Sequence, residues 1–203
     1  MQILKLKFKY ENRNSTQEKH NLDSQRFKNE ILNDEGISNN AKIIITVHSL
    51  KYDYLHSNRQ FLIKIVFKEE YRKTAISNCN RENVFIWNEI FEFKVVSQKH
   101  KLVLEVIEIV DNKEVVFGTI NIPIDVAENQ DEYECEIEIP EGKNGKMTGK
   151  KSEIKLKMQF IKSFYNYHVE SALRIEHEKK EILNNIQSIH KTIELLNSIF
   201  SLI

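Results

Sequence analysis

The chain has 203 residues, of which 40% are hydrophobic, and its 30 Lys and Arg balance its 30 Asp and Glu to a formal net charge of zero. This balance gives no reason to expect nucleic-acid binding over the whole surface, and no segment approaches the roughly 18 apolar residues of a membrane span. The length suits one medium domain with an appendage.

Cysteine usage and the N-terminus indicate the compartment. Cys79 and Cys135 lack metal-site spacing, and a secreted disulfide framework would use more cysteines. Lysines at positions 5, 7 and 9 interrupt any apolar run, so the first residues do not resemble a signal peptide. We therefore expect a cytoplasmic protein, although Asn14, Ser15 and Thr16 form a glycosylation sequon.

Residues 1–10 are predicted to form a β-strand with a lysine face. The apolar residues that alternate with lysine are Leu4, Leu6, Phe8 and Tyr10. A period of two is typical of a strand, and lysines suit an edge position; the alternative is a basic strand that faces a membrane. Residues 11–40 are predicted to be a polar linker, with a short capped helix around Phe27 as the alternative.

From residue 41 onwards, short apolar runs recur between polar turns. They lie at residues 41–48, 61–67, 71–76, 87–95, 102–108, 116–124, 133–139 and 154–160. Eight short strands at this spacing predict a mainly β fold, an antiparallel sandwich.

The strand at residues 87–95 begins with the only tryptophan of the chain. Trp87, Phe91 and Phe93 share one face of this strand, and Ile90 interrupts the polar face. We expect Trp87 to anchor the core; the alternative is an exposed aromatic that binds a partner.

The order of these motifs resembles a C2 domain over residues 41–162. The matching motifs are Trp87-Asn88-Glu89-Ile90-Phe91-Glu92-Phe93, Phe117-Gly118-Thr119-Ile120, Lys73-Thr74, and the strand with Leu102, Leu104 and Val106. The resemblance implies an eight-stranded C2-like sandwich at residues 41–163. It would follow an N-terminal strand and linker at residues 1–40 and precede a helix at residues 164–203.

In the family, calcium is held by aspartates from two loops at one end of the sandwich. Here Asn58, Val110 and Val115 occupy positions where the family has ligands. The acidic remnants are Asp53, Glu108 and Asp111. Because Ca²⁺ prefers several carboxylate oxygens, the resemblance implies a domain with no metal site and no cofactor.

A second family feature is a basic strand face that binds anionic lipid. The candidate residues are Lys64, Lys68, Arg72 and Lys73. Glu69 and Glu70 lie among them and offset much of the attraction, which is worth roughly 1 kcal/mol per basic residue. Membrane lipid is therefore a less favoured partner.

Enzyme chemistry has little support in the sequence. No Gly-rich phosphate loop, nucleophile elbow or zinc-protease motif occurs, and Glu176, His177 and Glu178 would point apart on a helix. We predict that the protein is not an enzyme.

The C-terminal segment has apolar residues at alternating steps of four and three, which is typical of a coiled-coil seam. These residues are Ile182, Ile186, Ile189, Ile193, Leu196, Phe200 and Ile203. Because such a helix needs a second wall, we expect it to dock onto other proteins in a multi-subunit complex. The alternative is packing along its own sandwich.

The combined prediction is a calcium-independent C2 scaffold subunit of a larger intracellular assembly. C2 domains joined to coiled coils resemble those of centriolar and ciliary scaffold proteins, so a microtubule-based cytoskeletal structure is the expected location, by analogy of architecture. The first alternative is a peripheral membrane adaptor that binds anionic phospholipid through the basic face, and the second is a regulatory subunit of an enzyme complex.

Overall fold

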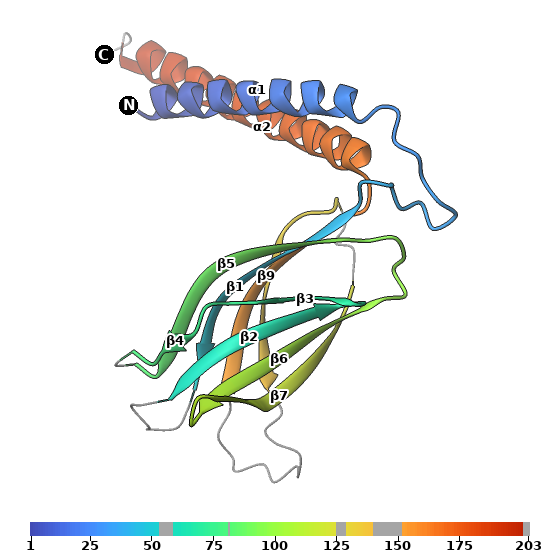
Figure 1. Cartoon of the computed structure of the whole chain (residues 1–203). Coiled ribbons are helices and arrows are strands. Elements are labelled where there is room, and N and C mark those ends of the chain that lie inside the picture. The colour runs from blue at the N-terminus through green and yellow to red at the C-terminus, as the bar shows by residue number, and fades with distance from the viewer. Residues whose placement is uncertain (53–58, 81, 125–128, 140–151, 201–203) are drawn as a thin grey trace. The chain divides into compact units, whose positions relative to one another are not determined.

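The computed structural model describes residues 1–52, 59–80, 82–124, 129–139 and 152–200 (Figure 1). These residues form two compact units, a sandwich at Ile31–Lys162 and a helical unit made of Met1–Glu30 and Ser163–Ile203. The elements, in order, are α1 (Gln2–Arg26), β1 (Lys42–Lys51), β2 (Gln60–Phe67), β3 (Glu70–Lys73), β4 (Ser77–Asn78), β5 (Val84–Lys94), β6 (Lys101–Val110), β7 (Lys113–Pro123), β8 (Tyr133–Ile139), β9 (Ser152–Ile161) and α2 (Phe164–Phe200).

The sandwich consists of two antiparallel sheets. One has the strand order β5-β1-β9-β8, and the other has the order β3-β2-β6-β7, with β4 pairing to β2. The predicted antiparallel sandwich is confirmed. The described chain has nine strands where eight were predicted, because the two-residue strand β4 carries no apolar signal of its own.

The core lies between the sheets and follows the alternation of the strands. Its largest fully buried side chains include Phe61, Phe67, Phe85, Phe93, Phe160, Leu102 and Leu104. Trp87 packs against this core as expected, but it is only half buried, and its Nε1 donates a hydrogen bond to the Ala75 carbonyl at 2.8 Å. Phe85 and Phe93 are the fully buried aromatic residues of β5.

The predicted N-terminal strand is wrong, because Gln2–Arg26 forms the helix α1. Ile3, Leu6 and Tyr10 are the half-buried residues of its first turns, at steps of three and four. Leu4 and Phe8, which the strand prediction placed on a buried face, are 71% and 66% exposed. The segment forms a helix and not a strand because it packs along α2, which provides the apolar contacts that an isolated helix lacks.

The predicted polar linker is also wrong over most of its length. Residues 11–26 continue α1, and residues 31–40 belong to the sandwich unit. There the Asn33 side-chain oxygen accepts hydrogen bonds from the backbone N–H groups of Glu35 and Ile37, at 3.0 and 2.9 Å. Gly36 lies in this turn with φ at +68°, a conformation that glycine adopts without strain.

The helical unit is an antiparallel pair, with the start of α1 and the end of α2 on the same side (Figure 1). Arg13 Nε lies 2.7 Å from Glu178 Oε2, and the Phe27 and Phe164 rings stack with centroids 4.9 Å apart. The two helices are far apart in sequence, since the whole sandwich lies between them.

Candidate functional site

The α1 face that meets α2 has heptad spacing but a polar centre. Half-buried residues recur along it at steps of three and four: Ile3, Leu6, Tyr10, Arg13, Gln17, His20, Ser24 and, just past the helix, Phe27. Asn14, Thr16 and Asp23, which lie beside this row, are also half buried. No residue of α1 is fully buried. The helix pair is therefore held by apolar contacts near its ends and by polar contacts in its middle.

Lys179 is the centre of the polar contacts. Its Nζ donates hydrogen bonds to Asn14 Oδ1 at 2.6 Å and to Gln17 Oε1 at 2.8 Å, and it lies 5.2 Å from the centre of the Tyr10 ring. Lys179 lies three residues before Ile182, the first residue of the predicted apolar seam, and it acts as an interhelical hydrogen-bond donor. Asn14 of the glycosylation sequon lies on this helix face.

The start of α2 is capped by a residue from the other end of the chain. The Ser163 hydroxyl donates to the Glu30 carboxylate at 2.8 Å and accepts from the Asn166 N–H at 3.2 Å. The backbone N–H groups of Phe164 and Tyr165 also donate to Glu30, at 3.3 and 3.2 Å. A carboxylate at a helix N-terminus accepts hydrogen bonds from the free N–H groups and interacts favourably with the positive end of the helix dipole.

The predicted docking seam on α2 is divided into a covered and an uncovered part. Ile182 is buried and Ile186 and Ile189 are half buried, whereas Ile193, Leu196 and Phe200 are 42%, 47% and 71% exposed. Every residue from 191 to 200 is exposed, and we call this segment the α2 tail. The predicted seam residue Ile203 lies outside the described residues.

The length of α1 accounts for this division. Arg13 lies opposite Glu178, and eleven residues further along each antiparallel helix, Gln2 comes level with Ile189. Both helices rise by the same amount per residue, so α1 begins where the tail leaves the pair. The alternative prediction, in which the helix packs along its own sandwich, did not anticipate a covering helix from the N-terminus.

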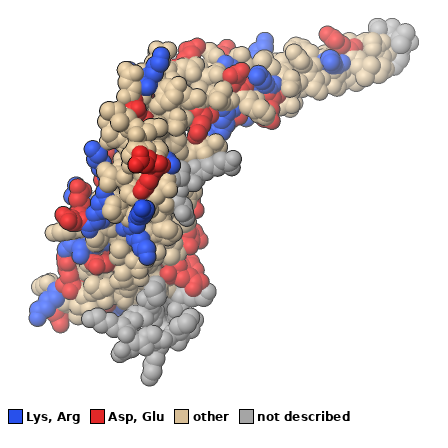
Figure 2. All heavy atoms as spheres, turned by 90° about the vertical axis from the view of Figure 1, so that its right-hand side faces the viewer, with Lys and Arg blue, Asp and Glu red and all other residues tan. Residues whose placement is uncertain are grey.

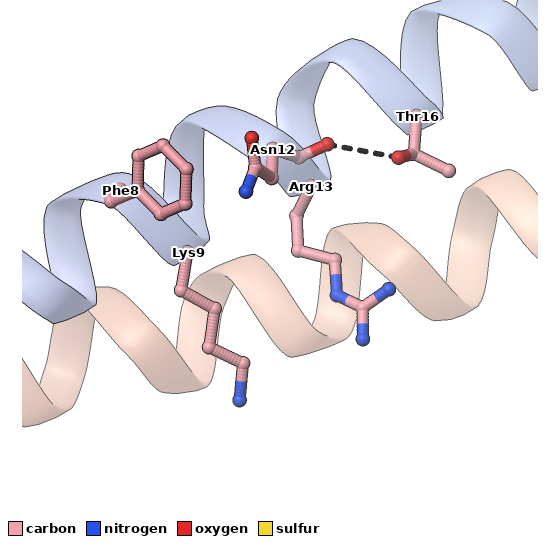
Figure 3. Close-up of a pocket in the computed structure, with 5 residues that line it drawn as sticks. All are labelled: Phe8, Lys9, Asn12, Arg13 and Thr16. Carbon is pink, nitrogen blue, oxygen red and sulfur yellow. Dashed lines mark hydrogen bonds between the residues drawn. The ribbon is translucent and has the colours of Figure 1, made fainter.

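A shallow hollow of about 360 Å³ lies on the same helix pair, lined by Phe8, Lys9, Asn12, Arg13 and Thr16 (Figure 3). Figure 3 shows Lys9 and Arg13 extending from α1 across the ribbon of α2. Arg13 is paired with Glu178, and the Thr16 hydroxyl donates to the Asn12 carbonyl at 2.9 Å. Of the side chains that line the hollow, Arg13 and Thr16 are therefore engaged in contacts within the helix pair.

Among the residues that the structure describes, those at the expected calcium end are not gathered as ligands. Glu108 Oε1 lies 3.2 Å from Arg59 Nε in an ion pair. Asp111 and Asn112 have φ values of 51° and 60° and form the two-residue turn between β6 and β7, which leaves no ligand loop there. Asp53 and Asn58 lie outside the described residues. Within the described ranges, no group of three His, Cys, Asp or Glu is placed to hold a metal ion.

The basic strand residues are largely paired with acids on the same sheet. Lys64 Nζ lies 2.8 Å from Glu105 Oε2, and Lys73 Nζ lies 2.6 Å from Glu114 Oε2. The hydrogen bond to Glu105 raises the pKa of Lys64, so the lysine keeps its positive charge at neutral pH. On the face that Figure 2 presents, basic and acidic side chains are interspersed.

The other two lipid candidates lie at the β2–β3 end of this sheet. Arg72 is 3.7 Å from Glu70, in an exposed pair, and Lys68 Nζ lies 5.6 Å from the centre of the Phe67 ring. The structure therefore brings the four candidates onto one region of the sheet but pairs three of them with carboxylates.

A family model described as "C2 domain" matches residues 37–139. Among solved structures, CC2D1B is similar at a TM-score of 0.50 and 12% identity, over 71% of this chain and 64% of that one. A C2 domain of plant extended synaptotagmin 1 is similar at a TM-score of 0.49 and 15% identity, over 60% of this chain and 94% of that one. No curated protein matches the chain. Of the two helices that the structure describes, neither is long and apolar enough to cross a membrane.

Proposed function

Because the chain belongs to the C2 domain family, we propose that it is a non-enzymatic interaction module that assembles with another protein chain through its α2 tail. One observation carries the proposal: Ile193, Leu196 and Phe200 continue the seam of α2 past the end of α1 and are exposed. The occupant that fits is an apolar helix face, because residues at heptad spacing interdigitate with those of a second helix.

Burial of the tail offers enough free energy for association. Fully burying one large apolar side chain contributes roughly 1.5–3 kcal/mol, and the exposed tail residues include Ile193, Leu196 and Phe200 on the seam and Leu195 and Ile199 beside it. The tail is already helical, so little backbone ordering opposes binding.

The membrane-adaptor function is the second candidate, and family membership supports it because C2 domains bind membranes or proteins. The ion pairs of Lys64 and Lys73 argue against it, since a lysine paired with a carboxylate adds little net field. A location in a ciliary or centriolar structure remains a prediction from architecture alone.

Site-specific photo-crosslinking in cells tests the proposal. A photoreactive residue in place of Asn197, which flanks the seam, should cross-link the chain to another protein chain. The matched control replaces Lys191, which lies on the opposite face of the same tail and should give little cross-linking. Equal yields from the two positions, or none from Asn197, would contradict docking through the seam.

A further inference from the structure

We propose that the chain forms a dimer in which the α2 tail packs antiparallel against the α2 tail of a second copy of the same chain. This inference rests on the proposed function, because it names the partner of the same tail. The dimer would have two-fold symmetry, so that one surface serves both copies.

Continuity with the existing helix pair is the first argument. The seam of α2 runs without interruption through Ile186, Ile189 and Ile193, and α1 covers it only as far as the level of Ile189. A second antiparallel helix placed on the remaining stretch would continue the packing that α1 begins. The tail of another copy has the matching length, since the same ten residues are uncovered on both chains.

The spacing of the seam permits a self-complementary register. With the two-fold axis between Ile193 and Leu196, Ile193 of one copy faces Leu196 of the other. In the same register Phe200 of the second copy lies level with Ile189, the half-buried residue at the edge of the stretch that α1 covers. Each layer of the dimer then pairs two different positions of the alternating seam. Each of the exposed seam residues between positions 191 and 200 then has an apolar neighbour.

The position of α1 favours the antiparallel orientation. In an antiparallel dimer, the α1 helix of each copy occupies the seam just before the other copy's tail begins. In a parallel dimer, both α1 helices would lie between the two α2 helices at the same level and would hold the tails apart. The covered half of the seam therefore allows only one direction for the second tail.

Charge does not oppose association of identical tails. Lys191 and Glu194 are the only charged residues between positions 191 and 200, and heptad spacing places both away from the seam. The positions that flank the seam carry Thr192, Asn197 and Ile199, which are uncharged. Like charges at flanking positions are a common device against self-pairing, and the tail has none there.

Sedimentation equilibrium of the purified full chain tests the dimer. The expected mass is twice the 24.1 kDa of one chain. Ile193→Asp combined with Leu196→Asp should return the mass to that of a monomer at the same concentration. Leu195→Asp is the matched control, because Leu195 is exposed on the tail but lies off the seam, and it should remain dimeric.

Disulfide formation between two variants tests the orientation. In a background with Cys79→Ser and Cys135→Ser, equal amounts of an Ile189→Cys chain and a Phe200→Cys chain should form mainly the mixed disulfide. In the proposed register the two Ile189 positions are separated by eleven residues along the axis, about 16 Å at 1.5 Å per residue. Mainly self-disulfides of each variant would overturn the antiparallel arrangement.

The remaining outcomes separate this inference from the proposed function. A wild-type chain that is monomeric, or a dimer that survives the double substitution, would overturn the inference. If a monomeric chain still cross-links from Asn197 to a different protein, the proposed function stands without the dimer. If it cross-links to nothing, both fail.

Discussion

His20 and His168 face each other across the helix pair with their Nδ1 atoms 2.9 Å apart. At this distance one imidazole donates an N–H and the other must accept it, so the two nitrogens cannot both carry a proton. Burial lowers the pKa of both histidines. The surrounding charges are Asp23 and Glu30, which raise the pKa of one or both rings, and Arg174 and Lys19, which lower it.

The helix pair should therefore lose stability in mild acid. A histidine whose folded pKa lies below its unfolded value of 6.5 takes up its proton more readily when unfolded. The contribution is complete above pH 6.5 and is lost as the pH falls below it. Thermal melts followed by circular dichroism at 222 nm should show the helical transition moving to lower temperature between pH 7.5 and 5.5.

His20→Leu combined with His168→Leu should flatten this pH dependence. The control is His177→Gln, because His177 is an exposed histidine on α2 that faces away from α1, and the pH dependence should persist in that variant. An equal flattening in the control, or none in the double variant, would show that the dependence comes from other groups.

Glu30 should contribute to stability through the cap of α2. Glu30→Ala removes the acceptor of Ser163 Oγ and of two backbone N–H groups, so we expect a loss of roughly 1 kcal/mol from the helical unit, the usual scale of a helix cap. Glu30→Gln keeps an acceptor oxygen and should lose less. Chemical unfolding measures both, and equal effects of Ala and Gln would point to charge alone.

Calcium should not stabilise the protein. The remnant acid Glu108 is paired with Arg59, and the β6–β7 connection is a two-residue turn. Differential scanning fluorimetry with and without millimolar Ca²⁺ should give the same melting temperature. A ligand at 100 times its Kd would add roughly 2.7 kcal/mol, so a clear upward shift would disprove this prediction.

The ion pairs on the β2–β6 sheet should limit binding to anionic membranes. Wild-type chain should remain in the supernatant of vesicles that contain phosphatidylserine at physiological salt. Glu105→Gln with Glu114→Gln frees Lys64 and Lys73 and should increase sedimentation, since each basic residue near the surface contributes roughly 1 kcal/mol. Glu92→Gln, whose partner Lys42 lies on the other sheet, serves as the control.

The sandwich could be predicted from sequence because each strand carries its own signal. The alternation of apolar and polar residues in segments such as Phe61 to Phe67 indicates which residues face the core. This pattern can be detected without knowing which strand lies beside the segment. The two-residue turn at Asp111 and Asn112 did not follow from alternation, since its positive φ values depend on the pairing of β6 with β7.

The helix α1 could not be predicted in the same way. Its seam has Arg13, Gln17 and His20 where an apolar pattern would be expected, so hydrophobicity gave no helical period beyond Tyr10. These residues are explained by α2, where Lys179 and Glu178 supply polar partners. The available signal was that polar residues, Arg13, Gln17 and His20, continue the steps of three and four that begin with apolar residues.

The central claim is that the chain docks through the uncovered seam of the α2 tail. The size of the native complex that contains the chain in cells tests this claim most directly. Tagged wild-type chain should elute in a complex larger than its own 24.1 kDa. Ile193→Asp with Leu196→Asp should elute as free chain while its sandwich melts at the wild-type temperature, and Leu195→Asp should behave as wild type. A double variant that remains in the complex would show that the chain docks elsewhere.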